Sequence, residues 1–160
     1  AVAAAVSSRP AAISIPLPLA HVEPRADRFV TIDEKELDCL ASNIYYEARN
    51  QSKIGQIAVG LVTRNRAEAD RWASTICGVV HAPKQFSWTH DGKQNTKRFK
   101  DTMAYLWATH IASRILSGEF DNVRDMFQSD HYHTTAVRPG WSKHMERVAV
   151  IDSHVFYVDR

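Results

Sequence analysis

One acidic residue, Glu47, stands where its side chain is expected to be partly buried. The apolar residues before it have the spacing of a buried helix stripe; they are Leu37, Leu40, Ala41 and Ile44. Glu47 continues this stripe, three residues after Ile44. Burial disfavours a charged carboxylate and raises its pKa, so such a group can hold a proton near neutral pH. Glu47 is therefore a candidate general acid.

A structural role is the competing interpretation of Glu47. The carboxylate could form an ion pair with Arg49, Arg64 or Arg66, and ion pairs also perturb carboxylates. The preceding residues, Tyr45 and Tyr46, cannot share one face of a helix. We expect one of them to pack inward and the other, Tyr46, to lie at the surface near Glu47 as a substrate contact.

A second cluster reads Gln85-Phe86-Ser87-Trp88. Amides and hydroxyls hydrogen-bond sugar hydroxyls, and aromatic faces cover sugar rings. Polar and aromatic residues alternate through Thr89, and the Asp91-Gly92 pair is a turn signal, which together predict a strand entering a hairpin. The cluster suits one wall of a saccharide groove, with an ordinary half-buried strand as the alternative.

The third cluster is His131-Tyr132-His133, followed by Arg138-Pro139-Gly140-Trp141. Histidines at alternate positions of a strand point the same way, so His131 and His133 could bind zinc with a third ligand. His144, His154 or Asp130 could supply that ligand, but no HExxH motif fixes the geometry. We favour hydrogen-bonded or substrate-contacting roles, with Tyr132 and His133 as candidate substrate contacts.

Composition sets broad limits on the function. The chain has 160 residues, of which 44% are hydrophobic and 24% charged, as in an ordinary globular domain. A formal net charge of +2 suits an anionic polymer such as a cell wall but is too small to indicate nucleic acid. No apolar run is long enough to predict a membrane span. The two cysteines, Cys39 and Cys77, are either one disulfide or two buried thiols.

The expected elements are mainly helical. Residues 1–30 are rich in Ala and Pro, which predicts a tail or linker. We expect residues 31–160 to form a single domain. Helices are expected over 31–49 with Thr31 as N-cap, over 54–69, over 76–80 after Ser74 or Thr75, and over 96–117 before Gly118. Short strands are expected over 148–151 and 154–158, with irregular structure over 119–130. Inner faces are assigned to Ile54, Ile57, Ala58, Leu61 and Val62, and to Phe99, Met103, Leu106, Trp107 and Ile111.

Taken together, these blocks resemble the SleB-type cell wall hydrolases, which include spore cortex-lytic enzymes. The resemblance lies in CLASNIYYEAR at 39–49, GQIAVGLVTRNR at 55–66 and ICGVVHAPKQFSW at 76–88. It continues with HYH at 131–133, with Pro139 and Trp141, and with HVFY at 154–157. It departs at Asn50-Gln51, where the family usually has Gly-Glu, and over 125–130, where the match is poor.

The resemblance implies an α+β, mainly helical, lysozyme-like domain with a small hairpin or sheet that acts on peptidoglycan glycan strands. It implies a lytic transglycosylase that splits the bond between N-acetylmuramic acid and N-acetylglucosamine, with Glu47 as acid and then base. No cofactor, metal, nucleic acid or membrane span is implied, and we expect a monomer. The implied place of action is the cell envelope, periplasmic or extracellular, or the host wall for a phage-encoded enzyme.

Two other classes compete with this interpretation. The first is a zinc-dependent wall amidase or peptidase that uses His131 and His133. The second is a wall-binding module without activity. Ordinary hydrolysis by two carboxylates is a variant of the favoured class, and it would need a partner acid such as Asp91 or Asp130.

Overall fold

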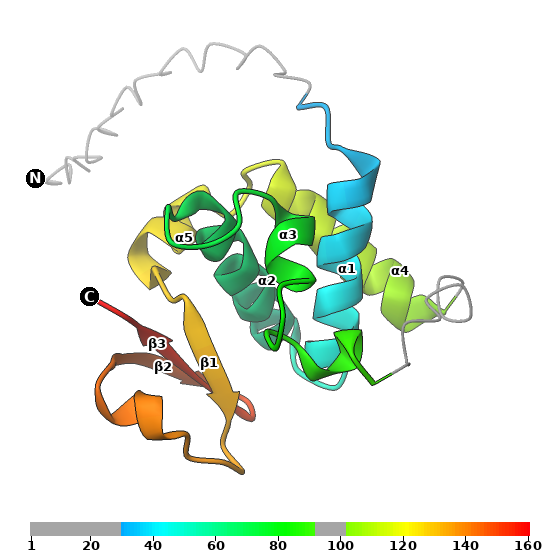
Figure 1. Ribbon diagram of the computed structural model, residues 1–160. Coiled ribbons are helices and arrows are strands. Elements are labelled where there is room, and N and C mark those ends of the chain that lie inside the picture. Colours follow the sequence, from blue (N-terminus) through cyan, green and yellow to red (C-terminus); the bar gives the residue numbers. More distant parts are fainter. Residues whose placement is uncertain (1–29, 92–101) are drawn as a thin grey trace, which may run out of the picture.

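The structure is a computed structural model that describes residues 30–91 and 102–160. The expected tail, apart from Val30, lies outside these residues, as do Phe99 and the Gly92 turn position. Helices make up most of the described chain, and one three-stranded antiparallel sheet stands beside them (Figure 1). The expectation of a mainly helical α+β domain is therefore confirmed. No described helix has the length and apolar character needed to cross a bilayer.

Helix α1, Glu34–Ala48, has its N-cap two residues later than expected. Its N-cap is Asp33, whose carboxylate accepts hydrogen bonds from the backbone N–H groups of Lys35 and Glu36. The predicted cap at Thr31 was wrong because Asp33 satisfies the same N-terminal donors from a later position. The C-terminal end near Ala48 and the burial of the predicted stripe are confirmed.

Helix α1 packs against α2, Lys53–Glu68, and α4, Met103–Leu116. Their shared core contains the fully buried side chains of Leu40, Ile44, Leu61, Ile111 and Ile115. Gly60 allows this approach, since a Cβ there would lie 2.5 Å from Ile115 Cδ1.

Two predicted inner faces were partly wrong. Met103 is 77% exposed and Leu106 50% exposed, because α4 turns a different stripe inward: Tyr105, Ala108, Ile111, Ala112 and Ile115. Small alanines on that stripe let the helices approach closely, whereas the prediction followed the largest apolar residues. Ile54, expected on the inner face of α2, is also exposed.

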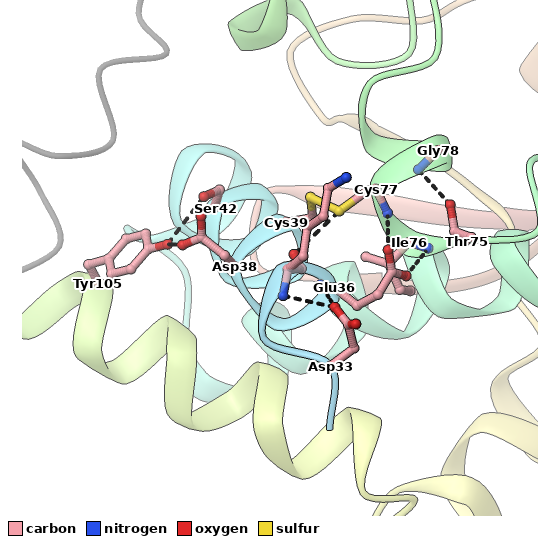
Figure 2. Close-up of a disulfide and its surroundings, with 11 residues drawn as sticks. Asp33, Glu36, Asp38, Cys39, Ser42, Thr75, Ile76, Cys77, Gly78 and Tyr105 are labelled. Atoms are coloured by element: carbon pink, nitrogen blue, oxygen red, sulfur yellow. Dashed lines mark hydrogen bonds between the residues drawn. A yellow bond between two sulfur atoms is a disulfide. The ribbon is translucent and has the colours of Figure 1, made fainter. Parts of the chain in front are cut away.

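The short helix α3, Ile76–Val80, is fastened to the first half of α1. A disulfide joins Cys39 to Cys77 across 38 positions of sequence, which decides between the two expected states of the cysteines. Glu36 accepts hydrogen bonds from the backbone N–H groups of Ile76 and Cys77, at 2.6 and 3.3 Å (Figure 2). Thr75 caps α3 from within its own segment, as expected.

The sheet has the order β1-β3-β2, with β1 at His131–Thr134, β2 at Glu146–Ile151 and β3 at His154–Val158. Both predicted C-terminal strands are confirmed. Phe156 of β3 is fully buried and packs with Val59 and Val62 of α2, which attaches the sheet to the helices.

Two expected elements are different in the structure. Residues 119–130 contain a helix, α5, Asp121–Phe127, which periodicity missed because none of its residues is buried. The predicted strand at 85–89 is a loop followed by the 3-10 helix η1, Ser87–Thr89. A second 3-10 helix, η3, Gly140–Lys143, lies between β1 and β2.

Hydrogen bonds connect the loop after α1 to the turn between β2 and β3. Gln51 Oε1 accepts from the backbone N–H and the hydroxyl of Ser153, at 3.1 and 3.0 Å. Ser52 donates from its backbone N–H and hydroxyl to Asp152, at 2.9 and 2.7 Å. The C-terminal end of α1 is thereby held against the sheet.

Candidate active site

Glu47 lies in the last turn of α1, with a half-buried side chain. The hydroxyl of Tyr132, on β1, donates a hydrogen bond to Glu47 Oε2 at 3.1 Å. Burial raises the pKa of Glu47, while the Tyr132 hydrogen bond and the positive charge of Arg66 lower it to a smaller extent. The direction of this pKa shift agrees with the prediction: the surroundings of Glu47 favour its protonated form more than water does.

The competing expectation of a structural ion pair is not supported by the three candidate arginines. Arg64 pairs with Glu68 and Asp121. The guanidinium of Arg49 lies over the ring of Tyr45, 5.0 Å from its centroid. Within 30–91 and 102–160, Glu47 has no cationic partner within 4 Å.

Tyr132 reaches Glu47 because β1 turns this side chain toward the helices. Tyr132 pairs with Phe156 in the register of β1 and β3, and its ring contacts those of Phe156 and His154, at 5.7 and 5.2 Å. Burial, with the charge of Glu47 as a further cause, holds the pKa of Tyr132 well above its usual value. Tyr132 therefore remains a hydrogen-bond donor to the carboxylate.

Arg66 belongs to the site although its sequence position suggested only an ion-pair partner for Glu47. Its side chain is 6% exposed, and Nε donates to the backbone oxygen of Asp130 at 2.6 Å. Its guanidinium lies 4.6 Å from the centroid of Trp72, and burial lowers its pKa. A signal existed in the sequence, because Arg66 follows Val62 by one helical turn and so continues the buried stripe of α2.

The residues from 85 to 88 play unequal parts in the structure. Gln85 accepts a hydrogen bond from Arg66 at 3.1 Å, and Ser87 is exposed. Phe86 and Trp88 are buried, so neither presents a free ring to a sugar. The alternation of polar and aromatic residues, read as a strand, arises from a 3-10 turn that inserts Trp88 into the core.

Trp88 positions Tyr46 beside the end of α1. Its indole N–H donates to Asn43 at 3.2 Å, and the Asn43 amide donates to Thr63 at 3.0 Å. The Tyr46 ring stacks on Trp88 with centroids 4.5 Å apart and planes 16° from parallel. Tyr46 is half-buried while Tyr45 is buried, as expected for the pair.

The structure does not bring His133 to Glu47. His131 and His133 alternate with Tyr132 along β1, and both contact Trp141 on the other side of the strand. His131 Nδ1 lies 2.8 Å from Asp130, and His133 Nε2 lies 3.1 Å from the hydroxyl of Tyr157. No group of three or more His, Cys, Asp or Glu side chains that could hold a metal occurs among the described residues.

Two of the surface hollows lie away from Glu47. One, between α2 and α5, is lined by Asn65, Glu68, Ala69, Arg124, Asp125 and Gln128. The other, between α1 and α4, is lined by Glu34, Lys35, Leu37, Asp38, Tyr105 and Thr109. The candidate site at Glu47 is therefore defined by its side-chain contacts and not by either of these hollows.

Comparisons with known proteins connect this arrangement to a family. The family model described as Cell Wall Hydrolase matches residues 50–157, beginning three residues after Glu47. A spore cortex-lytic enzyme of Bacillus cereus is 30% identical over 60 residues, which are 38% of this chain and 23% of that protein. One from Oceanobacillus iheyensis is 32% identical over 60 residues, 38% of this chain and 22% of that protein. The chain thus spans about a quarter of the length of these relatives.

Solved structures show the same fold. The catalytic domain of the Bacillus cereus SleB protein superposes with a TM-score of 0.64 at 20% identity, over 80% of this chain and 93% of that one. The catalytic domain of the germination-specific lytic transglycosylase SleB from Bacillus anthracis gives a TM-score of 0.60 at 20% identity, over 79% and 97%. The family match covers most of the chain, including Arg66, β1, β2 and nearly all of β3, and the resemblance to SleB-type enzymes is confirmed. The chain belongs to the Cell Wall Hydrolase family of enzymes.

Proposed function

We propose that the chain cleaves peptidoglycan glycan strands as a lytic transglycosylase, with Glu47 as its general acid and base. The observation that carries the proposal is the half-buried carboxyl of Glu47, held by one Tyr132 hydroxyl and without a described ion pair. A solved relative of the same fold is named as a lytic transglycosylase, which supports this reaction class.

The reaction needs one carboxyl group in two states. Protonated Glu47 gives its proton to the glycosidic oxygen as the bond from that oxygen to C1 of N-acetylmuramic acid breaks. The resulting carboxylate takes the proton of the 6-hydroxyl of the same muramic residue, whose oxygen bonds to C1 and closes a 1,6-anhydro ring. Glu47 ends protonated, and no water is consumed.

A second carboxylate is not required for this sequence, unlike in two-carboxylate hydrolysis. Asp130 is engaged elsewhere: it bonds His131 and pairs with Arg71, and these contacts lower its pKa despite partial burial. Its low pKa and occupied oxygens favour a structural role. Tyr46, Gln85, Ser87 and Tyr132 remain our proposed substrate contacts around Glu47, with Phe86 and Trp88 supporting them from the core.

We also propose that residues 31–160 form the catalytic unit, with residues 1–30 as a tail or linker, and that the enzyme works in the cell envelope or outside the cell. Peptidoglycan is found there, and a disulfide such as Cys39–Cys77 persists in oxidising surroundings.

Mass spectrometry of digested peptidoglycan tests the proposal directly. The expected products carry 1,6-anhydromuramic ends, and Glu47→Gln should yield almost none. Reducing muramic ends would instead show hydrolysis. Intact glycans with cut peptide stems, lost on addition of EDTA, would overturn the proposal in favour of a zinc amidase or peptidase. Binding without any cleavage product would indicate a wall-binding module.

A further inference from the structure

A cluster of rings covers the side of β1 that faces away from Glu47. His131 and His133 lie 5.4 and 5.6 Å from Trp141 of η3, between ring centroids. Tyr157 of β3 lies 5.3 Å from His133 and 5.5 Å from Trp141, and Trp72 lies 5.6 Å from His131. We call these five residues the aromatic face.

His131, His133, Tyr157 and Trp141 lie on the side of the sheet away from the Glu47 carboxyl, while Trp72 lies at the edge of the aromatic face, against the Arg66 guanidinium. Successive side chains of a strand point to opposite faces of a sheet, so Tyr132 points to Glu47 while its two neighbours point away. In Figure 1 the orange segment that carries η3 lies on the side of the sheet away from α1 and α4. Four of the five rings, all but Tyr157, are only half-buried, so part of each reaches solvent.

Three basic residues adjoin the aromatic face in sequence or in strand register. Arg138 and Lys143 flank Trp141 in sequence, and Arg147 pairs with Tyr157 in the register of β2 and β3. All three are exposed, and within the described ranges none of them forms an ion pair.

Two other exposed arginines differ in this respect. Arg71 pairs with Asp130 and Asp159, and Arg160 pairs with Glu146, the acidic residue nearest to Arg147 in sequence. The acid beside the rings, Asp130, is held by His131 and Arg71. The cations left over around the rings complement an anionic ligand.

We propose that the aromatic face and its three cations form a second binding surface for a carboxylate-bearing glycan strand. Indole and imidazole rings pack against the C–H faces of sugars, and guanidinium groups pair with carboxylates. The occupant follows from the proposed function, because peptidoglycan strands carry free carboxylates on their peptide stems and on muramic residues that bear no stem. The surface holds the polymer on one side of β1 while Glu47 acts on the other.

Binding to insoluble peptidoglycan tests this surface when cleavage is blocked by Glu47→Gln. In that background, Trp141→Ala should weaken binding about tenfold, as for a central aromatic contact. The double variant Arg138→Gln/Arg147→Gln should weaken binding about fivefold and remove most of its salt sensitivity. Leu106→Ala and Lys35→Gln change an exposed apolar residue and an exposed cationic residue away from the aromatic face. These two variants are the controls and should bind as the parent does.

The proposal would be overturned if the Arg138→Gln/Arg147→Gln variant bound peptidoglycan as tightly as the parent. This outcome can be read even if Trp141→Ala lowers the stability of the protein. Equal binding to chitin, a neutral glycan without carboxylates, would overturn the assignment of an anionic occupant. Product analysis of the unaltered enzyme judges the proposed function separately. The proposed binding surface can therefore be rejected while the proposed cleavage reaction is retained. Conversely, anhydromuramic products can be absent while the surface still binds peptidoglycan.

Discussion

Helix α1 carries Glu36 in its first turn and Glu47 in its last turn, and these two glutamates are held in different ways. Glu36, in the first turn, accepts hydrogen bonds from two backbone N–H groups of α3 (Figure 2). Glu47, in the last turn, accepts one from a tyrosine hydroxyl and loses water to burial. Two backbone donors fix the position of the Glu36 side chain, whereas burial raises the pKa of Glu47 despite its one hydrogen bond from Tyr132. One helix thus uses the same residue type as a structural cap and as a proposed proton donor.

The largest expected effect is a difference in activity between variants of Glu47 and variants of Glu36. Glu47→Gln removes the transferable proton but keeps the shape of the side chain, so we expect peptidoglycan cleavage to fall by about 10²–10⁴-fold. Glu36→Gln should keep activity within about twofold. Release of soluble fragments from cell walls measures both. Equal losses of activity in Glu47→Gln and Glu36→Gln would show that both changes act through folding of the protein and not through the reaction.

The next effect concerns the covalent link beside Glu36. Replacing both Cys39 and Cys77 by Ser frees the 38-position loop, which should lower the free energy of unfolding by about 3 kcal/mol. Denaturant titration measures the loss of stability. The unaltered protein in reducing buffer, where the disulfide is opened, should show a similar loss. An unchanged midpoint would show that Glu36 and the core hold α3 without the disulfide.

A smaller effect should follow from Glu36→Ala. The change leaves the backbone N–H groups of Ile76 and Cys77 without their acceptor, which should lower the free energy of unfolding by about 1 kcal/mol, as for a lost helix cap. Glu34→Ala is a suitable control, since Glu34 lies in the same turn and is exposed. Thermal unfolding followed by circular dichroism compares them, and equal losses would contradict a capping role.

The smallest expected change is in the pH dependence of activity. The Tyr132 hydroxyl favours the charged form of Glu47, so Tyr132→Phe should raise the pKa of Glu47 further. If the protonated acid begins the reaction, the fall in activity at high pH should then move to higher pH. Tyr105→Phe is the control, because Tyr105 donates its hydroxyl to Asp38 instead. A shift toward lower pH, or the same shift in both variants, would contradict this role for Tyr132.

The sequence predicted best where a residue's own helix determines its surroundings. Leu40, Ala41 and Ile44 defined the buried stripe of α1, and the partial burial of Glu47 followed from their spacing. By contrast, the contact between Glu47 and Tyr132 spans 85 positions and depends on the attachment of the sheet to α2. No local pattern carries that information.

Other parts of the site were predicted less well from local patterns. Trp88 looked like a surface aromatic because its neighbours are polar, yet its N–H finds Asn43 in the core. Tyr132 and His133 were both predicted as substrate contacts, although the strand alternation used to group His131 with His133 already places Tyr132 on the opposite face. Helix α5 gave no periodic signal, since it buries no residue.

The strand order has a consequence for the order in which the protein is made. β3 is the central strand and pairs with both β1 and β2, yet it is the last of the three to leave the ribosome. Until His154–Val158 has been synthesised, β1 has no strand partner and nothing aligns Tyr132 with Glu47. Under the proposed role of Glu47, a nascent chain that still lacks this segment should be inactive, even with its helices already folded.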